Sequence, residues 1–144
     1  MLGKAIAIAA KEFADETDKG GVPYMLHCLH VMHKVGPDDQ ELMIIAVLHD
    51  LVEDTDWTFD MLRDEGFSDR VIDALKLLTH YPIGHSEGQT YDDYIKSIST
   101  NEDARAVKLE DLKHNSDITR MKGLRKKDFD RLEKYHRSYE YLKF

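Results

Sequence analysis

Apolar residues recur at helical spacing along almost all of this 144-residue chain, and no segment alternates polar and apolar residues over a convincing length. Ile6, Ala9 and Phe13, for example, follow the three- and four-residue spacing that places side chains on one helix face. A chain without alternating segments has few ways to build a sheet. The pattern therefore favours an all-α fold, with seven or eight helices packed around one core in a single domain of residues 1–144.

Glycine, proline and capping residues divide the chain into its expected helices. Gly20-Gly21 ends the first helix, and Pro23 suits the first turn of the second. Residues 80–90 contain two glycines and a proline and are expected to form a loop. The expected helices cover about residues 2–18 and 23–35, a third from residue 38 or 39 through Val52, residues 58–66, one from Ser68 through Leu78, one from Tyr91, and residues 102–116 and 125–143.

Composition excludes several classes of partner. The net charge of −8 disfavours nucleic acid and anionic membranes, and no apolar run approaches the roughly 20 residues needed to cross a bilayer. The single cysteine, Cys28, cannot form an internal disulfide, which agrees with a reducing compartment. We therefore expect a cytoplasmic protein that binds a small molecule, with its oligomeric state open. Residues 122–137 carry seven Lys/Arg against three Asp/Glu, so they either attract a small polyanion or form a solvated helix face.

The segment HDLVED, residues 49–54, concentrates polar side chains directly after an apolar run. Adjacent helical residues point about 100° apart, so His49 and Asp50 can hold one metal ion from two sides. Glu53 and Asp54 follow them by four residues, so each acid stacks one turn above a candidate ligand and faces the same space. Such groups are costly to bury without a partner, and a metal ion beside a solvated cleft would relieve that cost.

Two further ligands are needed, and the candidates are His27 and Asp111. Lys108 and Asn115 lie on the helix face of Asp111, at i−3 and i+4. Two imidazoles and two carboxylates suit a divalent ion that keeps open positions for water and a substrate oxygen. Mn²⁺ is the expected ion, with Fe²⁺, Zn²⁺, Co²⁺ and Mg²⁺ as alternatives. Such a centre suits metal-assisted hydrolysis, in which Lys108 would offset the charge of an anionic substrate.

The order of these residues resembles the H…HD…D pattern of the HD phosphohydrolase superfamily. The surrounding sequence is similar to one branch, the RelA/SpoT-type (p)ppGpp hydrolase domain and its small stand-alone homologues. The HDxxED block, with PYxxH upstream and VKLxDxxxN downstream, makes the resemblance specific, whereas a lone HD pair would be weak. The similar segments are GVPYMLH at 21–27, AVLHDLVEDT at 46–55 and ARAVKLEDLKHN at 104–115, and the opening AIAIAAKEF and Leu78-Thr79 extend them over nearly the whole chain.

The resemblance implies removal of the 3′-pyrophosphate from a guanosine tetra- or pentaphosphate. It assigns activation of the attacking water and proton handling to Glu53 and Asp54. It also implies one metal ion, held by His27, His49, Asp50 and Asp111. Residues expected to contact the substrate are Lys19, Asn115, Arg131 and Tyr135 by resemblance, and Lys108 by its charge.

Asp18 departs from the family pattern, which has at this position an Arg that packs on the guanine base. A carboxylate would repel a phosphate-rich ligand or select a different base edge. The substrate therefore stays open, with a nucleoside monophosphate or a phosphorylated dinucleotide as alternatives to (p)ppGpp. A non-catalytic nucleotide-binding module is the other alternative, and the intact Glu53 and Asp54 argue against it. Whether the loop at residues 80–90 acts as a lid also stays open.

Overall fold

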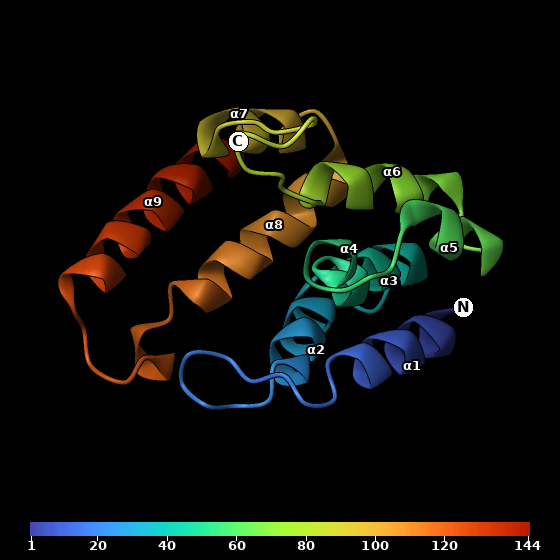
Figure 1. Cartoon of the computed structure of the whole chain (residues 1–144), viewed down its shortest axis with the longest axis horizontal. Helices are drawn as coiled ribbons and strands as arrows, with labels where there is room; N and C mark the ends of the chain where they lie inside the picture. The colour runs from blue at the N-terminus through green and yellow to red at the C-terminus, as the bar shows by residue number, and fades with distance from the viewer.

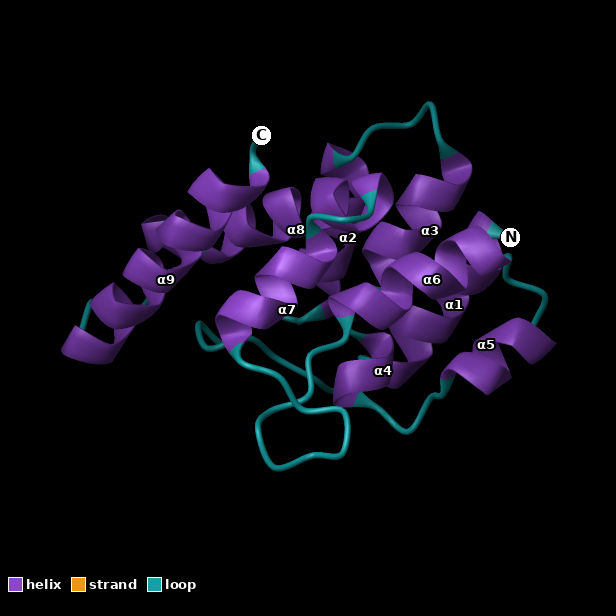
Figure 2. Cartoon of the chain, turned by 90° about the horizontal axis from the view of Figure 1, so that it is seen from above, coloured by secondary structure: helices purple, strands orange, loops and turns teal.

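Helices account for all the regular structure in the computed structural model, which describes residues 1–144, and no strand is present (Figures 1 and 2). The all-α prediction is confirmed. No helix combines the length and apolar character that crossing a bilayer would need. The elements are α1 (Leu2–Glu12), α2 (Met25–Lys34), α3 (Gln40–Leu48), α4 (Leu51–Asp54), α5 (Phe59–Asp64), α6 (Asp69–Leu78), α7 (Tyr91–Ile98), α8 (Glu102–Asn115), a 3-10 turn (Ile118–Arg120) and α9 (Lys126–Leu142).

Several helices begin at a residue whose side chain accepts a hydrogen bond from the backbone of the first turn. In five helices, the residue before the first turn accepts a hydrogen bond from the backbone N–H three residues later, which satisfies a donor that the helix itself leaves unpaired. Gly66, at φ 97°, ends the segment after α5 in a backbone conformation that other residues rarely adopt. The capping residues are Asp39, Thr58, Ser68, Thr90 and Asn101.

The first helix is shorter than the sequence predicted, because α1 ends at Glu12 and not near residue 18. Residues 16–24 instead fold back on themselves, with the Asp18 N–H donating to the Val22 carbonyl at 2.8 Å. Three acidic side chains lie within residues 15–18, and acids are unfavourable at the negative end of a helix dipole. The chain therefore leaves the helix and forms a loop that reaches toward α8.

The third expected helix is split into α3 and α4, which gives nine α-helices and not the seven or eight expected. The break falls on His49 and Asp50, and Asp50 has φ −103° and ψ 1°, outside the helical region. The two residues therefore lie at a junction between elements. Their side chains are directed by that junction, and not by a continuous helix as the sequence suggested.

α3 lies at the centre of the molecule. Its residues 44–48 are all buried, and it packs against α1, α2, α6 and α8. The buried apolar side chains form one continuous cluster around it. α8 runs beside α2 on one side and α9 on the other, so α9 is the outermost helix of this layer (Figure 1). The carboxyl end of α3, the middle of α8 and the first turn of α2 thus meet in the interior.

Truncation of the core should cost far more stability than the same truncation at the surface. Leu75 on α6 is 1% exposed, whereas Leu26 on α2 is 53% exposed. We expect Leu75→Ala to lower the free energy of unfolding by about 2–5 kcal/mol, because the side chain leaves a cavity. Leu26→Ala should change it by less than about 1 kcal/mol. Urea unfolding of both variants measures the difference, and equal losses would contradict this placement of the core.

Candidate metal centre

Four side chains from different elements converge at one point in the interior. His27 comes from α2, His49 from the end of α3, Asp50 from the start of α4 and Asp111 from α8. One potential ligand atom from each lies within 4.8 Å of the others. The two histidines and Asp111 are at most 4% exposed. The structure thus brings together the four residues that the sequence singled out as metal ligands.

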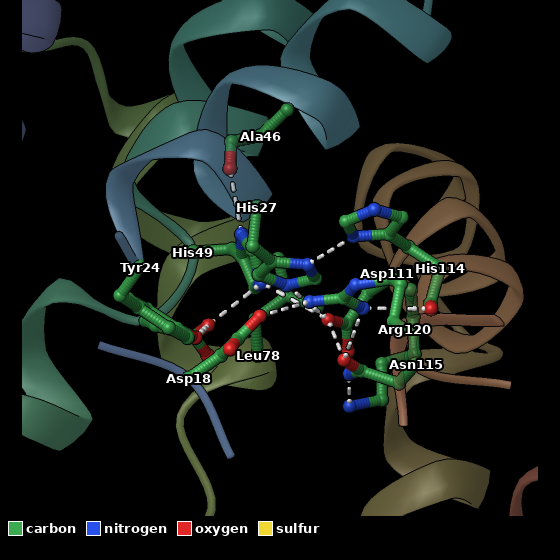
Figure 3. Close-up of polar contacts among 12 residues, drawn as sticks. Asp18, Tyr24, His27, Ala46, His49, Leu78, Asp111, His114, Asn115 and Arg120 are labelled. Atoms are coloured by element: carbon green, nitrogen blue, oxygen red, sulfur yellow. Dashed lines mark hydrogen bonds and ion pairs between the residues drawn. The ribbon is translucent and has the colours of Figure 1, made fainter. Parts of the chain in front are cut away.

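His49 is fixed in one orientation by its own helix. Its Nδ1 lies 2.6 Å from the carbonyl oxygen of Ala46, so Nδ1 carries the proton and donates it (Figure 3). Nε2 is then free of a proton when the ring is neutral, and it lies 2.9 Å from Asp50 Oδ2 and 3.3 Å from Asp111 Oδ1. A metal-binding histidine usually has this arrangement, in which one ring nitrogen donates its proton to a carbonyl and the other offers a lone pair to the metal.

Asp111 is the carboxylate on which the other groups converge. Its Oδ1 lies 2.9 Å from His27 Nε2 and accepts a hydrogen bond from Asn115 Nδ2 at 3.0 Å. The Lys108 ammonium contacts Oδ2 at 2.9 Å. Burial on its own raises the pKa of Asp111, but Lys108 and the imidazoles outweigh it and hold this pKa well below its usual range. Asp111 is therefore ionised and ready to bind a cation.

Tyr24 supports Asp50, a contact that sequence reasoning missed. The Tyr24 hydroxyl donates to Asp50 Oδ2, and burial together with the Asp50 charge raises the pKa of this phenol far above its usual value. Tyr24 therefore stays a proton donor at all ordinary pH values. Its position three residues before His27, within the PYxxH segment, is the sequence signal that could have identified it.

Glu53 and Asp54 lie at the open side of the centre. Potential ligand atoms of both lie within 4.8 Å of Asp50. The backbone N–H of His80 donates to Glu53 Oε1 at 2.7 Å, so the first residue of the loop at 80–90 holds this carboxylate. Lost hydration raises the pKa of Glu53, as does Asp50, and the same two causes together with Glu53 raise the pKa of Asp54 to about 6. Both acids are thus poised to exchange protons closer to neutral pH than free carboxylates.

The charge balance of this cluster suits a bound divalent cation. Asp50 belongs to two clusters, one with Asp111 and the two histidines and one with Glu53 and Asp54, and the Lys108 ammonium contacts Asp111. Carboxylates at such distances repel one another unless a cation lies between them. Two imidazole nitrogens and two carboxylates are also a donor set that borderline divalent ions accept. The residues present therefore fit a metal ion. The carboxylates are Asp50, Glu53, Asp54 and Asp111.

A cavity of about 350 Å³ lies between the loop after α1, the end of α8 and α9. Four of the residues expected to contact the substrate line it: Lys19, Asn115, Arg131 and Tyr135. Tyr24 lines the cavity as well, and its contact with Asp50 connects the cavity to this candidate ligand. Lys108 is not among its lining residues and is engaged with Asp111, so its expected contact with a phosphate stays a prediction.

Asp18 is a turn-forming residue whose charge is balanced within the protein. Its Oδ1 accepts hydrogen bonds from the Gly20 and Val22 N–H groups at 2.8 and 3.0 Å. Its Oδ2 accepts a hydrogen bond from the Arg120 guanidinium at 3.1 Å (Figure 3). The sequence gave no signal for this partner, because Arg120 lies 102 positions away. The repulsion of phosphate that the sequence suggested is therefore offset by Arg120, which lines the same cavity.

No known protein-family model matches this sequence. A guanosine-3′,5′-bis(diphosphate) 3′-pyrophosphohydrolase from Aquifex aeolicus (strain VF5) is 32% identical over 111 residues, which are 75% of this chain and 16% of the relative. A probable GTP pyrophosphokinase from Mycobacterium leprae (strain TN) is 30% identical over 122 residues, or 80% of this chain and 15% of the relative. The chain thus spans about one sixth of the length of the curated relatives that it matches.

The helical arrangement also has a counterpart among solved structures. A metazoan orthologue of SpoT, described as hydrolysing ppGpp and acting in starvation responses, superposes with a TM-score of 0.78. The match covers 98% of this chain and 84% of the other, at 20% sequence identity. At that identity the likeness concerns the fold.

Metal binding should stabilise the fold, because the four candidate ligands come from four helical elements. At Mn²⁺ concentrations about 100-fold above the dissociation constant, linkage gives roughly 2.7 kcal/mol, or a melting temperature higher by about 5–10 °C. Thermal melts with Mn²⁺ and with a chelator measure this shift, and Asp111→Asn should abolish it. A melting temperature that Mn²⁺ leaves unchanged, in protein that retains no metal, would contradict the assignment.

The Asp18 turn should contribute stability that depends on pH. Burial raises the pKa of Asp18, but its hydrogen bonds and Arg120 outweigh this and lower it overall, so the contribution is complete above the ordinary value of 3.8 and is lost as pH falls through the folded-state pKa. Asp18→Ala should cost about 1–2 kcal/mol at pH 7. Asp18→Asn, which keeps an acceptor for the turn, should cost about half as much. Urea unfolding from pH 7 to pH 2 should show the deficit of Asp18→Ala shrinking below pH 4, and a constant deficit would contradict the charge contribution.

Proposed function

We propose that this chain, which belongs to the HD-type RelA/SpoT hydrolase family, removes the 3′-pyrophosphate from guanosine 3′,5′-bis(diphosphate) by metal-dependent hydrolysis. Water would attack the 3′-linked diphosphate and release GDP and pyrophosphate. The proposal rests on the family relationship and on one observation above all. Four candidate ligands converge beside two carboxylates with raised pKa values. Tyr24 and Asn115, which contact two of these ligands, line a cavity that also carries cationic side chains.

His27, His49, Asp50 and Asp111 would hold the metal ion. When bound, such an ion supplies Lewis acidity toward a phosphoryl oxygen and a lowered pKa of bound water. Lys108 and Asn115 would keep Asp111 ionised and oriented, as their contacts at 2.9 and 3.0 Å support. Tyr24 would do the same for Asp50.

Glu53 would accept the proton of the attacking water. Its Oε1 is taken by the His80 N–H, which leaves Oε2 for the water, and its raised pKa makes it a better base than a free carboxylate. Asp54, with a pKa of about 6, would hold or release a second proton near neutral pH. The two acids thus supply the proton transfers that hydrolysis needs.

The cavity would bind the nucleotide. Lys19, Arg131 and Tyr135 line it together with the basic residues Lys122 and Arg125. Cations gathered around a concave, partly desolvated surface attract a polyphosphate more strongly than the net charge of −8 would suggest. Arg131 is paired with Asp128, so it reaches a phosphate only by sharing or exchanging that partner.

Mn²⁺ is the ion that we propose, since the donor set mixes nitrogen and oxygen. We further propose that residues 1–144 act as one hydrolase domain in the cytoplasm, with a small nucleotide and no nucleic acid as partner. The buried, unpaired Cys28 and the negative net charge support this setting.

A different nucleotide is the second candidate substrate, and the Asp18–Arg120 ion pair favours it. The family pattern has an Arg on the guanine base at position 18, whereas this chain has a carboxylate that is paired with Arg120 across the cavity wall. The base-binding edge is therefore built from different groups. A nucleoside monophosphate or a phosphorylated dinucleotide would use the same metal chemistry.

A substrate panel with the purified protein tests the proposal. With Mn²⁺ present, ppGpp should yield GDP and pyrophosphate faster than nucleoside mono-, di- or triphosphates yield products, and chelator should abolish turnover. Hydrolysis of another nucleotide alone would retain the metal chemistry and reject ppGpp as substrate. If the metal-loaded protein turns over no nucleotide, the proposed hydrolase function fails.

Glu53→Gln should separate chemistry from metal binding. The change keeps the shape of the side chain and removes the base, so turnover should fall at least about 100-fold while metal content stays near that of the wild type. Asp111→Asn is the matched control and should lower both. Steady-state kinetics with metal analysis of both variants gives the result. If Glu53→Gln loses metal as completely as Asp111→Asn, Glu53 is a ligand and not the base.

A further inference from the structure

The Nδ1 atoms of the two histidines in the metal centre have different kinds of hydrogen-bond partner. The outer nitrogen of His49 faces a backbone carbonyl, that of Ala46. The outer nitrogen of His27 faces another ring, with its Nδ1 lying 2.7 Å from Nδ1 of His114 (Figure 3). Metal-binding histidines usually donate their second N–H to a carboxylate, a backbone carbonyl or water, so a neutral imidazole is an unusual partner.

The contact between the two rings allows only one arrangement of protons with a metal bound. Two ring nitrogens at 2.7 Å share a single proton. His27 Nε2 points at Asp111 Oδ1, and it must offer a lone pair to a metal at that position. The neutral His27 ring then carries its proton on Nδ1 and donates it. His114 Nδ1 is therefore the acceptor.

His114 is itself held in place on two sides. The Arg120 guanidinium donates to the carbonyl oxygen of His114 at 2.7 Å, and the His30 ring stacks on the His114 ring with centroids 3.8 Å apart. These contacts leave Nδ1 as the ring nitrogen that faces His27. His114 lies three residues after Asp111, so one helix supplies both a ligand and the support of another ligand.

We propose that His114 is a positioning residue that fixes the tautomer and the ring orientation of the metal ligand His27 by accepting its Nδ1 proton. The proposal rests on the metal centre of the proposed function. It adds a residue that neither binds the metal nor touches the reacting groups. Loss of such a supporting hydrogen bond typically lowers metal affinity by about 10- to 100-fold.

The test compares two substitutions with the same branched skeleton. Asn places an acceptor oxygen where His114 has Nδ1, whereas Leu places a methyl group there, and both remove the stacking on His30. His114→Leu should weaken Mn²⁺ binding by about 10- to 100-fold, measured by calorimetric titration of the metal-free protein. His114→Asn should stay within about threefold of the wild type. The Co²⁺ absorption spectrum should change in the Leu variant and be retained in the Asn variant.

His30→Leu is the control for stacking, because it removes the neighbouring ring and keeps the acceptor. Its Mn²⁺ affinity should match that of the wild type. Melting curves of the metal-free variants establish that each one is folded. Equal affinities of His114→Leu and the wild type would overturn the proposal, and so would an equal loss in the Leu and Asn variants. A wild-type protein that binds no metal would instead refute the metal centre itself, and the proposal with it.

Discussion

The structure depends on the compensation of one buried charge, the carboxylate of Asp111. It is 4% exposed and lies within 3.3 Å of His27, His49, Lys108 and Asn115. A carboxylate buried without such partners would cost several kcal/mol, so the contacts that satisfy it also hold α2, α3 and α8 together. The same contacts leave two imidazole nitrogens facing one point. Local stability and readiness for a cation therefore have a common origin.

The candidate site therefore has a buried part, which holds most of the candidate ligands, and a part that is open to solvent. The candidate ligands lie at the first turn of α2, at the junction of α3 with α4 and within α8, whereas Glu53 and Asp54 are exposed at one edge. The cavity is walled largely by loops and by the outer helix α9. Loops and outer helices tolerate change better than a packed core does. The candidate metal ligands thus lie in the packed interior, while the cavity proposed for the nucleotide is formed by more adaptable parts of the chain. Asp18 illustrates the point, because its departure from the family pattern is matched by a partner, Arg120, in the 3-10 turn after α8.

The hydrogen bonds that orient the candidate ligands differ in whether a backbone group or a particular side chain provides them. His49 is oriented by a carbonyl of its own helix, three residues earlier, which any sequence could supply. Asp50 and His27 are supported by the side chains of Tyr24 and His114, which only particular residues can provide. We therefore expect a substitution at either supporting position to affect the candidate metal centre without altering a candidate ligand. This distinction gives a physical reason to treat both as parts of the site.

The sequence by itself determined the helical class and the candidate ligands, because spacing along a helix and the chemistry of imidazole and carboxylate are local properties. It also indicated Glu53 and Asp54, which follow His49 and Asp50 by one turn. Only the tertiary structure decided that the helix breaks at this pair and that α1 stops at Glu12, since both follow from competition between helix and nearby polar contacts. It likewise decided the contacts between distant positions, such as the imidazole behind His27, 87 residues away. No local pattern encodes such a meeting, because packing of the whole chain brings the two rings together.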